Sequence, residues 1–309
     1  MFQELKNELL SRIGRSDEHY RIYNECFKAS SLKELRAAIT GQFSWYCLHG
    51  VLDEQIIDDY LDQFKEMNVF VNRDVRNGHL LVTKGEYKAN GNALVIVLNG
   101  SLTARGSVEA NCYNNSKINA AGSCTVNLWG DSTGDISGNC NCYAFDNSKC
   151  RVYMNARADL FDNSEAMAFN RSKMVLTGNA HAVLNDDSYA RCYDNTSVRV
   201  KQQSTAELFG NSNASAYGYG RVFAYGNNDV RLFELSTLYC NGNDGKFKIY
   251  ATDYTHTYLH ECKNSDVEVS ASSFAVVDSF IGLGFQCEVN DNSMIRDCSN
   301  GDVITHHIC

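Results

Sequence analysis

The sequence predicts a mainly β protein: a two-sided parallel β-solenoid of sixteen residues per coil and about ten coils, with an asparagine ladder and a small N-terminal helical cap domain. Three observations support this prediction. Residues 92–251 form an eight-residue repeat that runs without an insertion for twenty rows. Every second row ends in Asn or Asp, whereas residues 1–75 space their apolar residues as helices do.

The eight-residue repeat alternates like a β-strand with one buried face. Typical rows read CysAsnCysTyrAlaPheAspAsn at 140–147 and SerThrAlaGluLeuPheGlyAsn at 204–211. Position one is small, positions three and five are mostly Ala, Val, Leu, Ile or Cys, and positions two and four are polar or mixed. A helix cannot keep this pattern, because eight is not a multiple of its 3.6-residue period. We therefore expect one strand and one turn in each row.

Position eight shows that two rows make one coil. In alternate rows it is always Asn or Asp, whereas the rows between follow no such rule. We expect these side chains to stack and to form hydrogen bonds from coil to coil, with Asn accepting a left-handed backbone. The predicted ladder consists of Asn99, Asn115, Asp131, Asn147, Asn163, Asn179, Asn195, Asn211, Asn227 and Asn243.

Residues 1–75 predict a helical N-terminal domain of four helices. Gly14 ends the first helix and Ser16 caps the second. Ser31 and Glu34 read as a capping box for the third helix, and Asp53 caps the fourth. Because a parallel stack exposes unpaired backbone at its first coil, we expect this domain to cover that coil. A separate docking role is the alternative.

Residues 76–91 read as a transition from helices to sheet. Two apolar runs, 69–71 and 80–82, flank Asn77-Gly78. This dipeptide is typical of the type I′ turn of a β-hairpin. We therefore expect an antiparallel hairpin before the first coil.

Residues 252–309 predict an irregular, acidic C-terminal cap, because the repeat register fails after residue 251. The apolar run 280–285 is either the core of this cap or a homo-oligomer contact. His256, His260, Glu261 and Cys262 resemble a metal-ligand cluster, but a spacing of four needs a helix and this segment looks extended. We expect no metal site and no cofactor.

Charge and cysteine usage limit the partners and the compartment. The net charge is −9, yet residues 92–251 carry 14 basic and 14 acidic side chains, so a long phosphate-binding surface is not expected. Seven of the 13 cysteines occupy inward positions of the repeat, where Cys packs as a small hydrophobe. The N-terminal stretch reads as an amphipathic helix and the sequence has no long apolar span. We expect a reduced, cytoplasmic protein without a membrane segment.

Several rows resemble a known repeat. AspAsnSerLysCysArgValTyr and AspAsnSerGluAlaMetAlaPhe are similar to the octapeptide repeats (Asp/Gly-Asn/Ser-Ala/Ser-x-Val/Ala-x-Ala-Tyr) of β-solenoid proteins from bacteria, phages and mobile elements. The resemblance covers about half of the chain. It implies a solenoid and a bacterial or phage setting, and it carries over no catalytic residue.

The function predicted from these features is non-catalytic protein binding or scaffolding. The sequence has no nucleophile elbow, zinc-protease motif or phosphate-binding loop. Variable outward positions on a rigid repeat favour a recognition surface. A structural, self-assembling protein is the second hypothesis, and a polysaccharide-acting β-helix enzyme is the third. The predicted contact residues are outward aromatic and basic side chains: Tyr143, Arg157, Tyr189, Arg191, Arg221, Phe223 and Tyr239.

Overall fold

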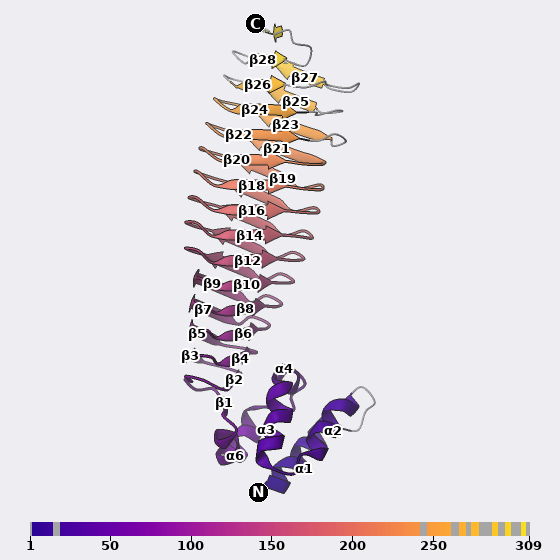
Figure 1. Cartoon of the computed structure of the whole chain (residues 1–309), viewed down its shortest axis with the longest axis vertical. Helices are drawn as coiled ribbons and strands as arrows, with labels where there is room; N and C mark the ends of the chain where they lie inside the picture. Colours follow the sequence, from indigo (N-terminus) through magenta and orange to yellow (C-terminus); the bar gives the residue numbers. More distant parts are fainter. Residues whose placement is uncertain are drawn as a thin grey trace. The chain divides into compact units, whose positions relative to one another are not determined.

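The protein is a mainly β, parallel β-solenoid of about 11 turns with an N-terminal helical region, as the sequence predicts (Figure 1). The computed structural model describes residues 2–14, 19–241 and 246–260, and the segments 266–269, 273–277, 286–289, 294–297 and 304–306. Its contacts divide the chain into two units, Met1–Gly134 and Asp135–Cys309, which are treated in turn. Even-numbered strands belong to sheet A with β1 and β29, and odd-numbered strands from β3 to β27 belong to sheet B.

The first unit contains six helices within its described residues, where four were expected. They are α1 (Phe2–Ile13), α2 (Tyr20–Lys28), α3 (Leu32–Gly41), α4 (Phe43–Leu48), α5 (Glu54–Asp59) and α6 (Leu61–Glu66). The predicted third and fourth helices are each divided where Gln42 and Tyr60 leave the helical backbone conformation. The predicted cap at Ser16 lies outside the described residues.

The two remaining predicted helix caps are present. The Ser31 hydroxyl accepts a hydrogen bond from the Glu34 N–H at 3.3 Å, and the Asp53 carboxylate accepts one from the Ile56 N–H at 2.9 Å. The Glu34 carboxylate accepts from the Ser30 N–H at 2.7 Å, rather than from Ser31 as in a standard capping box. Backbone groups at both helix starts are thus satisfied by side chains.

The helices share one hydrophobic core with the first strands of sheet A. Leu5, Phe43 and Phe64 from the helices cluster with Leu81 of β2 (His79–Val82) and Ile96 of β4 (Leu94–Val97). Strands β2 and β4 therefore bury side chains on both faces, one toward the solenoid interior and one toward the helices. The helical region covers the outer face of these strands.

Residues 69–91 form the start of the solenoid and not the predicted hairpin. Strand β1 (Val69–Val71) pairs with β2 in parallel, with Val69 opposite His79. Between them Val75 makes a parallel bridge to Ala89 of β3 (Glu86–Ala89) in sheet B, so the chain circles instead of reversing. The hairpin prediction is wrong because Asn77-Gly78 serves the turn that leads into β2.

Coil length changes within the first unit. Val95 lies opposite Ala110, fifteen residues on, whereas Leu102 lies opposite Ile118, sixteen residues on. The predicted register thus begins at β5, one eight-residue row (half a coil) later than expected. The remaining strands are β5 (Ser101–Gly106), β6 (Glu109–Cys112), β7 (Lys117–Gly122), β8 (Thr125–Leu128) and β9 (Thr133–Gly138), the last of which contains the boundary between the units.

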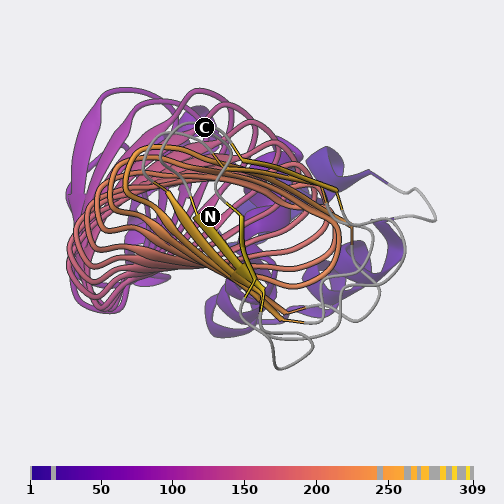
Figure 2. The same cartoon turned by 90° about the horizontal axis from the view of Figure 1, so that it is seen from above.

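The second unit continues the two-walled coil, and its strands lie one above another in Figure 1. Seen from above, its coils are flattened, with the two sheets as opposite walls (Figure 2). Its strands are β10 (Asn141–Ala144), β11 (Lys149–Val152), β12 (Arg157–Leu160), β13 (Glu165–Ala168), β14 (Lys173–Leu176), β15 (His181–Leu184), β16 (Tyr189–Cys192), β17 (Ser197–Val200), β18 (Thr205–Leu208), β19 (Asn213–Ala216), β20 (Arg221–Ala224), β21 (Asn228–Leu232), β22 (Thr237–Asn241), β23 (Phe247–Ala251), β24 (His256–His260), β25 (Asp266–Val269), β26 (Phe274–Val277), β27 (Gln286–Val289), β28 (Met294–Asp297) and β29 (Ile304–His306).

The register changes near residue 241, earlier than predicted. Asn228 lies opposite Phe247, nineteen residues on. This insertion explains Lys246 and Lys248, which an uninterrupted register would place inside: both are exposed, and Phe247 and Ile249 are buried instead. Strands β24 to β28 then keep parallel pairing with offsets of eighteen to twenty residues. The predicted irregular cap from residue 252 is thus a continuation of the coil through β28, and the apolar run 280–285 lies outside the described residues.

The interior follows the predicted inward positions. Positions three and five are buried, and at position one a serine hydroxyl commonly donates to the carbonyl three residues earlier, as from Ser164 to Phe161 at 2.7 Å. The nine cysteines whose side chains are described are all buried. Burial raises the pKa of the Cys112 and Cys192 thiols to about 12, so both remain protonated and unreactive at neutral pH.

The turns carry a stronger ladder than the predicted one. The left-handed residue is at position seven in both turns, as at Asp162, Asp186 and Asp194, and not at position eight. Its side chain accepts from the N–H of the position-seven residue one coil earlier: Asp186 from Asn170 at 2.8 Å and Asp194 from Gly178 at 3.1 Å. The position-eight N–H already bonds a backbone carbonyl, so position seven is the one that needs a side-chain acceptor.

The predicted asparagine ladder exists as longer contacts between side-chain amides. Asn179 approaches Asn163 at 3.5 Å, Asn211 approaches Asn195 at 3.5 Å, and Asn227 approaches Asn211 at 3.4 Å. These distances lie beyond the usual range for N–H···O bonds. Asn243 lies outside the described residues.

Candidate binding surfaces

The seven predicted contact residues all lie on the outer face of sheet A in the second unit. They come from β10, β12, β16, β20 and β22, at alternating positions that point away from the interior. Parallel pairing with a sixteen-residue offset keeps like positions in line, as with Arg157 opposite Lys173 and Arg221 opposite Thr237. Several of the seven residues belong to two kinds of local group, which are arginines with their hydrogen-bond partners and a row of stacked aromatic rings.

The arginines of this face differ in their partners. Arg157 forms a two-pronged ion pair with Asp159, at 2.9 and 3.3 Å. Arg191 donates to the Tyr189 hydroxyl at 2.8 Å and to Glu207 at 3.0 Å. Burial, with the nearby Glu207 carboxylate, raises the pKa of Tyr189 to about 12. Arg157 and Arg191 thus each already have a carboxylate partner on this face.

An aromatic row occupies the far part of this face. Phe223 stacks on Tyr239 with ring centroids 5.0 Å apart, and Tyr239 stacks on Tyr258 at 4.9 Å. The two tyrosines are 40% and 38% exposed. Sequence reasoning missed Tyr258 because the insertion before β23 hides its alignment with Tyr239. Arg221 lies one outward position before Phe223 on β20.

The row presents ring edges and hydroxyl groups. The rings are nearly parallel, at 12° and 7°, so both faces of Tyr239 are covered by its neighbours. Sugars and nucleobases bind aromatic side chains through the ring faces. An edge-on row of Phe and Tyr is instead a partly apolar surface with hydroxyl groups, such as protein interfaces use.

A second exposed row follows the turns that lead from sheet B to sheet A. Tyr219, Leu235 and Tyr254 are 62%, 43% and 64% exposed. Tyr219 and Leu235 occupy position eight in successive coils, and the nineteen-residue offset brings Tyr254 into the same column. Sequence reasoning also missed this row, because alternate position-eight residues seemed to follow no rule.

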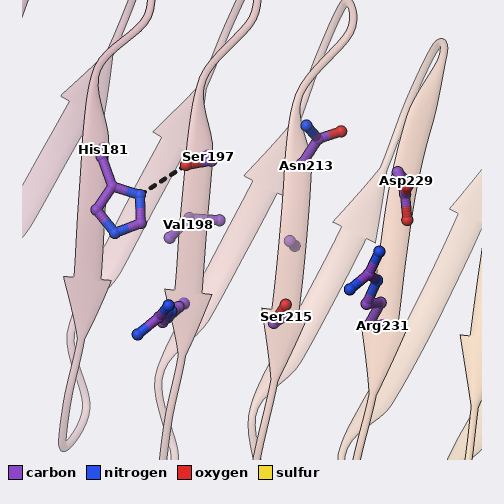
Figure 3. A pocket seen from close by; sticks show the side chains of 9 residues that line it. His181, Ser197, Val198, Asn213, Ser215, Asp229 and Arg231 are labelled. Carbon is purple, nitrogen blue, oxygen red and sulfur yellow. Dashed lines mark hydrogen bonds between the residues drawn. The ribbon is translucent and has the colours of Figure 1, made fainter. Parts of the chain in front are cut away.

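A trough of about 230 Å³ lies on the outer face of sheet B (Figure 3). Strands β15, β17, β19 and β21 line it, and the short side chains of Ser197, Asn213 and Ser215 form its floor. His181 lies at one end and donates to or accepts from the Ser197 hydroxyl at 2.6 Å. Asp229 and Arg231 lie at the other end, on β21. None of these residues was predicted as a contact residue.

The metal-like histidines do not converge. His256 and His260 are exposed at the two ends of β24, which is extended as expected. Glu261 and Cys262 lie outside the described residues. Within the described part of the chain, no group of three or more His, Cys, Asp or Glu side chains is arranged to hold a metal ion. Among the same residues, no helix has both the length and the apolar character needed to cross a membrane.

Comparisons with known proteins leave the fold and these surfaces as the basis for function. Neither a scan against protein-family models nor searches of curated proteins and of solved structures found a match.

Proposed function

We propose that this protein is a non-catalytic, protein-binding or scaffold β-solenoid whose partner contacts the outer face of sheet A. The observation that supports this most directly is the stacked row of the half-buried Phe223 and the exposed Tyr239 and Tyr258. Each ring is held by its neighbour, so little side-chain freedom remains to be lost on binding. Stiff, partly apolar rings with hydroxyl groups are typical hot-spot residues.

The same row argues against the polysaccharide-acting alternative. Sugar binding uses exposed ring faces, and here the inner ring faces are covered. The neighbouring carboxylates of sheet A, Asp159 and Glu207, each pair with an arginine. A glycosidase instead needs two carboxyl groups facing a common cleft.

The chemistry around the row defines the partner we expect. Arg221 is exposed and, among the described residues, has no ion pair of its own. A partner with an apolar centre and an acidic group at its edge would cover the rings and pair with Arg221. We place this interaction in the cytoplasm of a bacterium, or in a phage or mobile-element setting, on the basis of the octapeptide resemblance.

The experiment compares the two sheets. The tagged full chain, the double variant Phe223→Ser/Tyr239→Ser and the control Tyr250→Ser would be used to capture partners from a lysate of the source cells. Tyr250 is a 37% exposed tyrosine on sheet B, so its variant changes a similar surface on the other wall. The partner would then be purified and its affinity measured by calorimetry.

We expect a stoichiometric partner that binds the wild type and Tyr250→Ser equally, and the double variant at least about 30-fold more weakly. Equal affinity for all three proteins would refute the assignment to sheet A. Recovery of only further copies of the chain, with mass growing with concentration in ultracentrifugation, would favour the self-assembling alternative. A photoreactive residue at position 258 should crosslink to the same partner.

A further inference from the structure

The trough on sheet B results from a run of short outward side chains between longer ones. Ser215 on β19 is in register with Arg199 on β17 and with Arg231 on β21. The two arginines are thus two strand spacings apart, about 9.6 Å, with a serine between them. Arginine side chains are long enough to lean over the serine from both sides.

These two arginines differ from those around them. Arg151, Arg157 and Arg191 each pair with a carboxylate at 2.9 to 3.1 Å. Within the described residues, neither the Arg199 nor the Arg231 side chain has a hydrogen bond or an ion pair. Both arginines line one open hollow, and neither forms an ion pair with Asp229, the carboxylate that also lines it, so their hydrogen-bond donors are available to a ligand.

The polar lining adds further donors. The Ser215 hydroxyl lies between the two arginines, and Ser197 and Asn213 lie between His181 and Asp229 in the neighbouring outward row (Figure 3). His181 is half-buried, and its pKa is lowered by burial and by the charge of Arg199. The carboxylate of Asp229 also lines the hollow and would face a hydroxyl or ammonium group of a ligand.

We propose that this trough is an anion-binding site in which Arg199 and Arg231 hold a tetrahedral oxyanion of the phosphate type above Ser215. Two guanidinium forks and a hydroxyl offer more donors, from more directions, than the two oxygens of a carboxylate can accept. A tetrahedral group has oxygens directed to both sides. The remaining volume, toward His181 and Asn213, accommodates the group that carries the phosphate. This site is on the opposite sheet from the proposed protein-binding face and does not depend on it.

The test is a titration of the full chain with inorganic phosphate at low ionic strength, measured by calorimetry. The His181 ring resonances, assigned with a His181→Gln variant, report binding at the site itself. Parallel titrations use phosphoserine, sulfate and acetate. The variants are Arg199→Gln and Arg231→Gln, and the control is Arg171→Gln, an exposed arginine in a turn that makes the same change in net charge. Circular dichroism confirms that each variant is folded.

We expect saturable phosphate binding that shifts the His181 signals. Arg199→Gln and Arg231→Gln should each weaken the affinity for phosphate by at least about tenfold. Arg171→Gln should bind as the wild type does. Tighter binding of phosphoserine than of free phosphate would identify a phosphate ester as the ligand, and equal binding would identify the free ion. The proposal is overturned by the absence of saturable binding, by equal loss in the control, or by acetate binding as tightly as phosphate.

Discussion

The framework of this solenoid and its outer faces follow different rules. At inward positions and at position seven of the turns, the coils from β10 to β21 repeat the same solution: a buried small or aliphatic side chain, and a left-handed turn residue. The two outer faces share that backbone but differ in chemistry. Sheet A carries a stacked aromatic row beside Arg221, and sheet B carries a trough in which Arg199 and Arg231 lie on either side of a serine. The framework therefore specifies the fold, and the outward positions are free to specify function.

The largest loss of stability should come from substitutions of interior residues, and it should be similar on the two sheets. Leu176 on β14 and Leu184 on β15 are fully buried. Leu176→Ala and Leu184→Ala should each lower the free energy of unfolding by about 2–5 kcal/mol, since each leaves a cavity in a thin core. The outward control Val175→Ala should cost less than about 1 kcal/mol. Urea unfolding followed by circular dichroism measures all three, and a similar cost for Val175→Ala would contradict the division between framework and face.

The second largest loss of stability should come from substitutions in the position-seven ladder of the turns. Asp186 accepts from the Asn170 N–H and adopts a φ of 57°. Asp186→Ala should lower the free energy of unfolding by about 1–2 kcal/mol, because it removes the acceptor and keeps a β-carbon in the left-handed region.

Two further substitutions at residue 186 separate those causes. Asp186→Gly loses the side-chain acceptor but adopts the left-handed backbone without steric cost, so it should lower the free energy of unfolding by less than Asp186→Ala does. Asp186→Asn keeps a side-chain acceptor and also tolerates the left-handed backbone, so it should leave the free energy of unfolding nearly unchanged. If alanine were tolerated as well as asparagine, the position-seven ladder would contribute nothing.

A stabilising change is expected at the least suitable turn residue. Met154 has a φ of 61° and is 57% exposed, so its side chain gains little from packing. Met154→Gly should raise the free energy of unfolding by about 0.5–1 kcal/mol, because glycine adopts this conformation without a steric cost. Met167 is similarly exposed but lies in β13, so Met167→Gly should lower stability. Thermal unfolding of both variants tests the contrast, and a loss of stability in Met154→Gly would contradict it.

The smallest expected effect is on the pKa of His181, on sheet B. In the folded protein His181 faces Glu165, Ser197 and Arg199, and burial, then Arg199, lowers its pKa below 6.5. Arg199→Gln should raise the pKa but leave it below 6.5, because burial is the larger cause. NMR titration of the histidine rings measures both values, and a pKa that did not rise would show that Arg199 has no effect on the trough.

The sign of this linkage is defined by the lowered pKa. As pH falls through the unfolded-state pKa, the unfolded chain takes up a proton that the folded chain excludes. The contribution of His181 to stability therefore decreases between pH 6.5 and its lower folded-state pKa, and changes no further below that. Arg199→Gln should narrow this pH range, because it raises the folded-state pKa of His181 toward 6.5.

The candidate surfaces were only partly predictable. The alternation of the repeat placed Phe223 and Tyr239 on one outer face, because every second residue of a strand points the same way. Tyr258 was missed because the insertion before β23 shifts its column by three residues. The trough was missed because it depends on short side chains on two neighbouring strands, β17 and β19, between longer ones on β15 and β21, and no single row shows that combination.

By itself, the sequence determined the two-walled coil, its inward residues and its sixteen-residue length, because an alternating pattern repeated in one register has only one face to bury. It did not determine where the stack begins or how far it extends. Parallel pairing of β1 with β2, and the continuation through β28, depend on backbone hydrogen bonds between residues far apart in sequence, which accept turns of different lengths. Tertiary structure also decided that position seven forms the stronger ladder, since only the stacked coils show which backbone N–H lacks a backbone acceptor.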